Sequence, residues 1–189
     1  MFTPKRNLQA AALLVAVSAA ATAFAQSQDR YGFGTPIGAQ DLAKFFAIPA
    51  DGAGLPPGSG TAAAGAKVFA DNCAACHGDK GQGNPAKGIG GDRLLGGRGT
   101  LASDTPIKTV ESYWPYATTL FDYVKRAMPF SAPGSLSDND VYAVVAYILS
   151  EAKIIQPTDT MNATTLPKVT MPNRDGFIPD SRPELELYH

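Results

Sequence analysis

The sequence predicts an all-α domain with irregular extensions at both ends. The first observation is the segment 138–151, where apolar residues recur at helical spacing: Val141, Val144, Val145, Ile148 and Leu149. Ser137 and Asp140 give this helix a capping-box-like start. The second observation is Thr61, which can cap another helix running to about Asn72.

These two helices are expected to cross closely. Gly65 and Phe69 are four residues apart and share one face of the first helix. A glycine at the centre of a helix costs ~1 kcal/mol relative to alanine, so Gly65 indicates a neighbour that needs the space. Tyr147 of the terminal helix is expected to meet this face as ordinary core packing.

The only two cysteines of the chain lie in the run Cys73-Ala74-Ala75-Cys76-His77. The pattern Cys-x-x-Cys-His is typical of covalent haem c attachment, with one thioether from each cysteine to a haem vinyl group. Because His77 follows Cys76 directly, its imidazole is expected beneath the iron as an axial ligand. The motif therefore predicts one haem, held by Cys73 and Cys76.

Three alternatives account for less of this motif. A structural zinc site needs four ligands, and after these three residues the only other histidine is the terminal His189. A thioredoxin-like dithiol needs no adjacent histidine and expects a βαβ context. A bare disulfide is the third, and it leaves His77 unexplained.

The start of the chain has the pattern of a secretory signal peptide. Lys5 and Arg6 precede an apolar run over residues 8–23, and Ala23-Phe24-Ala25 has the small-x-small form of a cleavage site. This predicts cleavage of residues 1–25. The alternative is a membrane anchor, but the run is short of the ~20 apolar residues of a spanning helix. Because haem is attached to cysteines outside the bacterial cytoplasm, signal and motif both predict a periplasmic protein.

Net charge and hydropathy limit the classes of partner that can be expected. The chain has 16 basic and 17 acidic residues, and loss of Lys5 and Arg6 makes the mature chain more acidic. This balance gives no reason to expect nucleic acid. No membrane span is expected in the mature chain, because no later segment is long and apolar enough.

The rest of the chain divides into three expected parts. Residues 26–60, rich in Gly, Pro and Ala, form an N-terminal arm with one short helix at 39–46, either lying on the domain or acting as a mobile linker. Residues 61–151 form the domain. The C-terminal extension, 152–189, either docks or is disordered, and Phe177 and Ile178 after a turn favour docking.

Residues 78–99 are dense in glycine and are expected to be loop. A backbone carbonyl is needed to accept the His77 Nδ1 proton, which leaves Nε2 for iron. Pro85 is a candidate for shaping this turn, but the sequence does not identify the carbonyl. Arg98 either pairs with a haem propionate or is a solvated surface arginine.

Two further helices are expected before the terminal one. The first, short, spans 106–114 and begins with proline in a favoured first-turn position. The second opens at Pro115 and ends at Met128-Pro129, because proline stops a helix. Trp114 and Tyr116 carry ring NH and OH groups that could reach haem propionates, or they are aromatic core with satisfied tips.

Met128 is the expected sixth ligand of the iron. Its thioether would project from a helix end into a loop on the far side of the haem. Met161 and Met171 lie on a proline-rich tail that loses more chain entropy on reaching the iron. His189 could compete only by folding back into the pocket.

The order of Cys73–His77, a glycine-rich loop, Met128-Pro129 and a terminal helix resembles class I cytochrome c over roughly residues 61–151. The resemblance implies N- and C-terminal helices crossing over a covalent haem. Three further segments resemble the cytochrome c subunit of bacterial sulfur-compound dehydrogenases, namely the Sox-type sulfane dehydrogenase and related sulfite dehydrogenases. These segments are 52–60, 113–123 and 171–177.

In that family a molybdenum-cofactor subunit oxidises the substrate and passes electrons to the cytochrome. The implied partners are such a dehydrogenase subunit and a downstream cytochrome or oxidase. Sox-type members often carry two haems, whereas this chain has one Cys-x-x-Cys-His. A sulfite dehydrogenase-type monohaem subunit or an independent relative therefore fits at least as well.

Iron coordination predicts an electron-transfer protein rather than an enzyme. His77 and Met128 would saturate the iron, leaving no position for substrate. One alternative is a haem enzyme with an open or cysteine-ligated iron, and the absence of a third cysteine excludes the latter form. Another is a ligand-binding cytochrome in which Met128 is displaced.

Overall fold

The computed structural model describes residues 34–42, 47–83, 91–178 and 182. The chain divides into two units, Met1–Phe46 and Ala47–His189. In the first, the described residues contain helix α2 (Ala39–Leu42), the start of the helix expected at 39–46. The rest of that helix, the predicted signal peptide and Pro85 lie outside the described residues. Within those residues, no helix combines the length and apolar character needed to cross a membrane.

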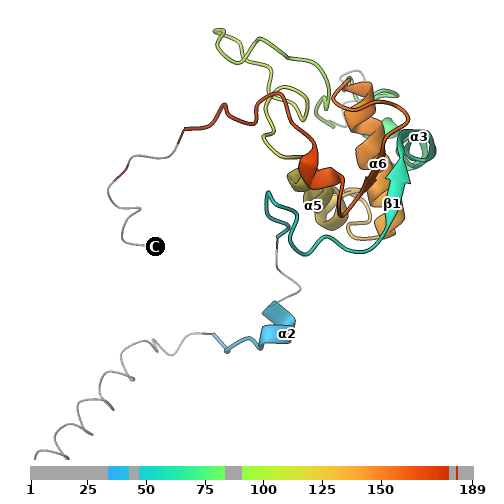
Figure 1. Cartoon of the computed structure of the whole chain (residues 1–189), viewed down its shortest axis with the longest axis vertical. Coiled ribbons are helices and arrows are strands. Elements are labelled where there is room, and N and C mark those ends of the chain that lie inside the picture. The colour runs from blue at the N-terminus through green and yellow to red at the C-terminus, as the bar shows by residue number, and fades with distance from the viewer. Residues whose placement is uncertain (1–33, 43–46, 84–90, 179–181, 183–189) are drawn as a thin grey trace, which may run out of the picture. The chain divides into compact units, whose positions relative to one another are not determined.

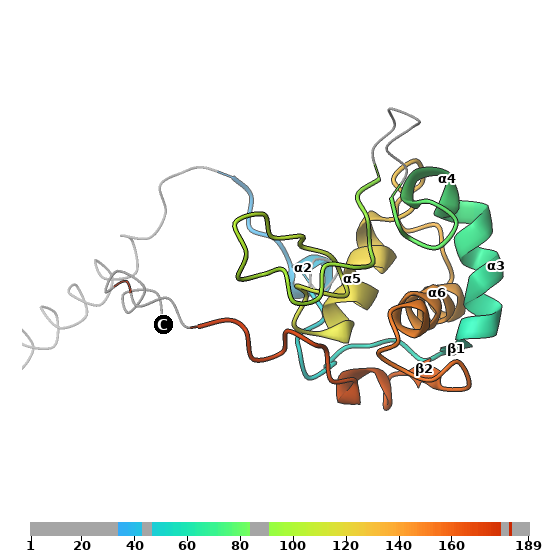
Figure 2. The same ribbon diagram turned by 90° about the horizontal axis from the view of Figure 1, so that it is seen from above.

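The second unit is helical, with one small sheet (Figure 1). Its elements are β1 (Ser59–Thr61), α3 (Ala62–Asn72), α4 (Ala74–His77), α5 (Ala117–Ala127), α6 (Asp138–Glu151), β2 (Thr160–Asn162) and the 3-10 helix η3 (Leu166–Lys168). Helix α6 lies between α3 and α5, and β1 and β2 lie side by side below them in Figure 2. The buried core is centred on α6, whose residues Val141 to Ala146 are all nearly inaccessible to solvent.

The predicted crossing of the first and last helices is confirmed. Thr61 caps α3 by accepting the N–H of Ala64 at 3.3 Å. A Cβ added to Gly65 would lie 1.9 Å from the carbonyl oxygen of Ala143, so glycine lets α3 touch the backbone of α6. The rings of Phe69 and Tyr147 pack 5.1 Å apart beside this contact.

The predicted short helix at 106–114 is wrong, because that segment forms turns and irregular backbone. The Thr109 hydroxyl accepts the N–H of Ser112, and the Ser112 hydroxyl accepts the N–H of Thr109, each at 3.0 Å. Buried hydroxyls that bond nearby backbone compete with a helical ladder. Helix α5 then begins at Ala117, two residues after Pro115, and ends before Met128 as expected.

The arm from Ala47 onward lies on the domain surface rather than acting as a linker. The N–H of Ile48 donates to the Asp122 carboxylate at 3.0 Å. The Tyr142 hydroxyl donates to the carbonyl of Pro56 at 2.9 Å, and the Ser59 N–H donates to the Asn139 side chain. These bonds tie the arm to α5 and α6.

The described tail also docks, mainly through residues other than Phe177 and Ile178. Strand β2 pairs with β1 in antiparallel register, with Met161 opposite Gly60. The described tail contributes Met161, Leu166, Val169 and Met171 to the hydrophobic core cluster. By contrast, Ile178 is 90% exposed, and Phe177 is half-exposed against the Tyr113 ring. The disordered-tail alternative therefore does not hold for residues 152–178.

Gly65→Ala tests the helix crossing. Alanine favours an isolated helix over glycine, but here its methyl group would overlap the Ala143 carbonyl. We expect the variant to lose about 1–3 kcal/mol of unfolding free energy, the usual cost of overpacking. Denaturant unfolding followed by circular dichroism measures this, with Ala63→Ser on the exposed face of α3 as a control. Equal or greater stability of Gly65→Ala would mean that the helices do not touch here.

Candidate functional site

A cavity of about 580 Å³ lies among α3, α4, α5 and α6, within the size range of cofactor sites. Its helical wall is apolar and comes from residues whose side chains also belong to the core: Phe69, Leu120, Val124, Val144 and Ile148. The remaining wall comes from the Cys73–His77 segment, from loop residues between Gly91 and Trp114, and from Met128, Pro129 and Phe130. The cavity thus joins the two sequence features predicted to bind haem.

The two cysteines lie together at one side of the cavity. Cys73 ends α3 and caps α4, and Cys76 lies one turn later. Both are free thiols, so the bare disulfide is not formed. Burial, and then the neighbouring Cys76, raises the pKa of the Cys73 thiol to about 11. A thiol with this pKa is protonated at neutral pH.

The carbonyl that the sequence could not identify belongs to Asp92. It lies 2.7 Å from Nδ1 of His77. Because a carbonyl oxygen only accepts, Nδ1 must carry the hydrogen, and Nε2 keeps its lone pair for a metal. A Cβ on Gly91 would lie 2.7 Å from the backbone of Cys76, so glycine lets this loop approach α4 closely enough for the bond.

Met128 reaches the same cavity from a separate element. It caps the C-terminus of α5, with its N–H bonded to the Val124 carbonyl at 3.2 Å. Met161 and Met171 are instead 3% and 1% exposed within the core, and neither lines this cavity. The structure therefore brings Met128 to the cavity with His77, and it does not bring the tail methionines there. His189 lies outside the described residues.

The residues on this cavity fit haem c better than a metal ion alone. Within the described residues, no group of three or more His, Cys, Asp or Glu side chains could hold a metal ion. Two thiols, one imidazole with a free Nε2 and one thioether suit covalent attachment and axial ligation of haem iron.

Comparisons with known proteins agree with this fit. Residues 62–152 match the family model of cytochrome c. The chain is 35% identical over 107 residues to cytochrome c6 of Picosynechococcus sp., which is 53% of this chain and 81% of that protein. The chain belongs to the cytochrome c family. Its cofactor is therefore covalent haem c, and its fold is the class I cytochrome c fold that the sequence predicted.

Two other similarities concern sulfur-compound dehydrogenases. The crystal structure of the sulfane dehydrogenase SoxCD from Paracoccus pantotrophus matches with a TM-score of 0.71 and 39% identity, covering 83% of this chain and 76% of that one. The thiosulfate dehydrogenase of Stutzerimonas stutzeri is 32% identical over 102 residues, 54% of this chain. This cytochrome chain matches only 31% of that enzyme's length.

Arg98, Trp114 and Tyr116, the candidates for contacts with haem propionates, lie in different places in this cytochrome. Trp114 lines the haem cavity, with its ring 5.6 Å from that of Tyr123. Tyr116 does not line it, and its ring is covered by the Arg174 guanidinium at 5.1 Å. Sequence reasoning missed Arg93 and Lys108, two cations that do line the cavity. Their charge was the only available signal, and many surface residues share it.

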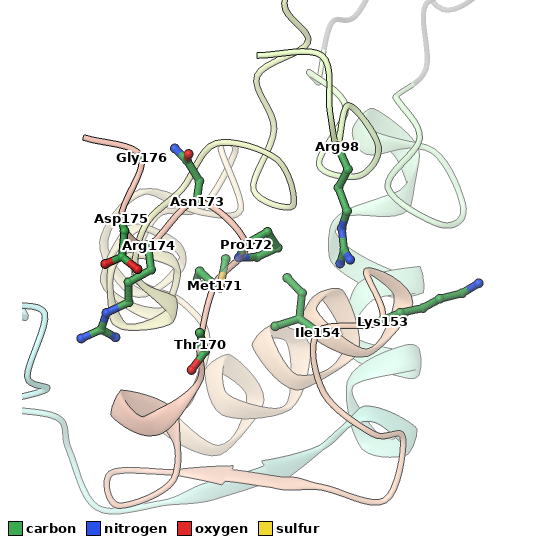
Figure 3. Close-up of a pocket in the computed structure, with 10 residues that line it drawn as sticks. All are labelled: Arg98, Lys153, Ile154, Thr170, Met171, Pro172, Asn173, Arg174, Asp175 and Gly176. Carbon is green, nitrogen blue, oxygen red and sulfur yellow. The ribbon is translucent and has the colours of Figure 1, made fainter. Parts of the chain in front are cut away.

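Arg98 lies outside the haem cavity. Its Nε pairs with Glu111 at 2.7 Å, and its Nη2 donates to the carbonyl of Ala152 at the end of α6. Figure 3 shows the side chain extending toward Ile154, beside tail residues such as Met171 and Pro172 that line a second cavity of about 600 Å³. The guanidinium thus joins the loop to α6.

Replacing Cys73 and Cys76 together by alanine tests the attachment site. Both thioethers are lost, so we expect no haem to remain with the chain on a denaturing gel. Because the apolar cavity walls then lose their filling, the apo chain should also accumulate poorly and unfold without a cooperative transition. Ala75→Ser, an exposed change inside the same motif, is the control. Covalent haem in the double variant would contradict the assignment, and a stable cooperative apo fold would contradict the role of the haem in folding.

Proposed function

We propose that this chain is a periplasmic monohaem cytochrome that transfers single electrons, with thioethers at Cys73 and Cys76 and axial ligands His77 and Met128. One observation carries the proposal: His77, its Nδ1 already bonded to Asp92, and Met128 line one cavity. When bound, haem c supplies a one-electron couple. The rest of the function depends on how these residues hold it.

The ligand pair favours electron transfer over chemistry on a substrate. A histidine and a methionine complete six-coordination, so no position is left for substrate. The thioether is a soft, neutral ligand that stabilises ferrous iron and raises the reduction potential. The cavity walls act in the same direction, because Phe69, Leu120 and Val144 are at most 2% exposed and disfavour the added charge of ferric iron.

The electron donor we propose is a molybdenum-containing dehydrogenase that oxidises sulfite or a related sulfur compound, with a downstream cytochrome or oxidase as acceptor. Two findings support it: the resemblance of segments 52–60, 113–123 and 171–177 to cytochrome subunits of such enzymes, and the similarity to a sulfane dehydrogenase structure. Encounters of this kind typically bury less than ~1,200 Å². The predicted signal peptide supports export to the same compartment.

We further propose that the functional domain, predicted as 61–151, works together with the described tail. The tail residues Leu166 and Met171 are fully buried against it. Asn173 also donates to the carbonyl of Tyr113 at 2.8 Å, next to Trp114 on the cavity wall.

A second candidate is a haem enzyme acting directly on a sulfur compound. The similarity to thiosulfate dehydrogenase favours it, because that relative is an enzyme by name. It requires a sixth position that opens to substrate, which means displacement of Met128. The two candidates therefore differ in what the purified cytochrome does alone.

Met128→Ala tests the sixth ligand. We expect loss of the thioether–ferric charge-transfer band and a lower reduction potential, because a soft, neutral ligand is removed. Visible spectroscopy and redox titration measure both effects. Met171→Leu is the matched control, since it removes a thioether from the buried core at nearly constant volume. An unchanged band in Met128→Ala, or its loss in Met171→Leu, would place the ligand elsewhere.

An electron carrier and an enzyme differ in whether reduction of the haem protein by a sulfur compound needs a partner. Purified ferric holo-protein mixed with sulfite or thiosulfate should stay oxidised, because a saturated iron offers no substrate position. Adding a sulfur-compound dehydrogenase subunit should then produce rapid reduction, followed at the ferrous absorption bands. Rapid reduction by either compound without a partner would instead favour the haem enzyme.

A further inference from the structure

The segment that carries Met128 packs against the core at its ends, through Met128 and Leu136, but its middle is exposed. Between α5 and α6, residues 130–135 are exposed, and Phe130 is 86% exposed. The backbone bonds within the segment are local, from Ala132 N–H to the Pro129 carbonyl at 2.9 Å and from Ser135 N–H to the Ala132 carbonyl at 3.3 Å. The path of this segment beyond Met128 therefore depends on how its two ends are held.

Lys125 joins the end of this segment, at the start of α6, to the beginning of the segment, at the end of α5. It lies in the last turn of α5, three residues before Met128. Its ammonium lies 2.7 Å from Oδ1 of Asp138, the first residue of α6, and donates to the carbonyl of Leu136 at 3.2 Å. One side chain thus joins the start and the end of the Met128 segment.

This contact differs from an ordinary surface ion pair. The side chains of Lys125 and Asp138 are 34% and 35% exposed, and Oδ1 of Asp138 is itself buried. Among the described residues, that oxygen accepts no hydrogen bond, and the ammonium of Lys125 is its ion-pair partner. Removing the ammonium would leave a buried carboxylate oxygen unpaired, which is far costlier than losing an exposed pair.

We propose that Lys125 is a positioning residue that closes the 128–137 segment and so keeps the Met128 thioether at the iron. The proposal rests on Met128 being the sixth ligand. Lys125 does not line the haem cavity, so it acts through the segment and not on the haem itself. Loss of the clamp would let the segment open and an external ligand compete with the thioether.

Imidazole binding to the ferric holo-protein tests the clamp. Lys125→Met keeps the aliphatic stem and removes the charge, and we expect it to bind imidazole about three- to tenfold more tightly than the wild type. The thioether–ferric charge-transfer band should also weaken. Lys125→Arg restores the cation and should bind imidazole as the wild type does. Lys67→Met is the matched control, because Lys67 pairs with Asp71 at a similar 2.8 Å on the solvent face of α3.

The outcomes separate positioning from general stability. If Lys125→Met lowers the unfolding midpoint while imidazole affinity stays within twofold of the wild type, the ion pair only joins two helices and the proposal is overturned. An equal gain in Lys67→Met overturns it too. If Lys125→Met does not accumulate, Asp138→Asn decides by the same measurement. Failure of the ligand assignment is distinguishable, because Met128→Ala would then leave the band intact.

Discussion

Contact between the backbones of α3 and α6 is the constraint on which the rest of this cytochrome depends. At Gly65 a single methyl group would overlap the Ala143 carbonyl, and at Gly60 a Cβ would lie 2.1 Å from the Ala143 nitrogen. With the helices this close, Phe69 and Cys73 on α3 face the same cavity as Val144 and Ile148 on α6. Strand β1 leads directly into α3 and pairs with β2 of the tail. The close packing of α3 on α6 therefore also fixes the strand to which the tail is bound.

Outside the helices, the site depends on backbone bonds of irregular segments. The Asp92 carbonyl that orients His77 belongs to a loop. Two residues further on, a hydrogen bond from the Leu94 N–H to the Gly81 carbonyl, at 2.7 Å, holds this loop. Glu111 then holds that loop through the N–H of Gly96 at 2.6 Å and through Arg98. A shift in this network would turn the imidazole without touching the haem. The orientation of the His77 imidazole therefore depends partly on Gly81, Gly96 and Glu111, which do not line the cavity.

Local patterns predicted much of this arrangement. Some features can be recognised from a few neighbouring residues: the cap at Thr61, the glycine at Gly65 and the helical spacing of 138–151. The Cys-x-x-Cys-His motif likewise identifies haem attachment from five consecutive residues. Long-range features were not predictable in this way. The Asp92 carbonyl has no side-chain signature, β1 and β2 are too short for alternation, and Arg98 is held by Glu111 and Ala152, which are distant in sequence. The helix predicted at 106–114 does not form, because buried hydroxyls of that segment bond its backbone N–H groups without a helix.

The central claim is that one cavity holds haem c with Met128 opposite His77. The most direct test is nuclear magnetic resonance of the reduced holo-protein, with carbon-13 on the methionine methyl groups. Without Met1, which lies in the predicted signal peptide, the chain has three methionines: Met128, Met161 and Met171. With Met128 bound to iron, one methyl signal should lie far from the usual range because of the haem ring current, and that signal should be lost in Met128→Leu. A shifted signal that belongs to Met161 or Met171, or three ordinary signals, would contradict it.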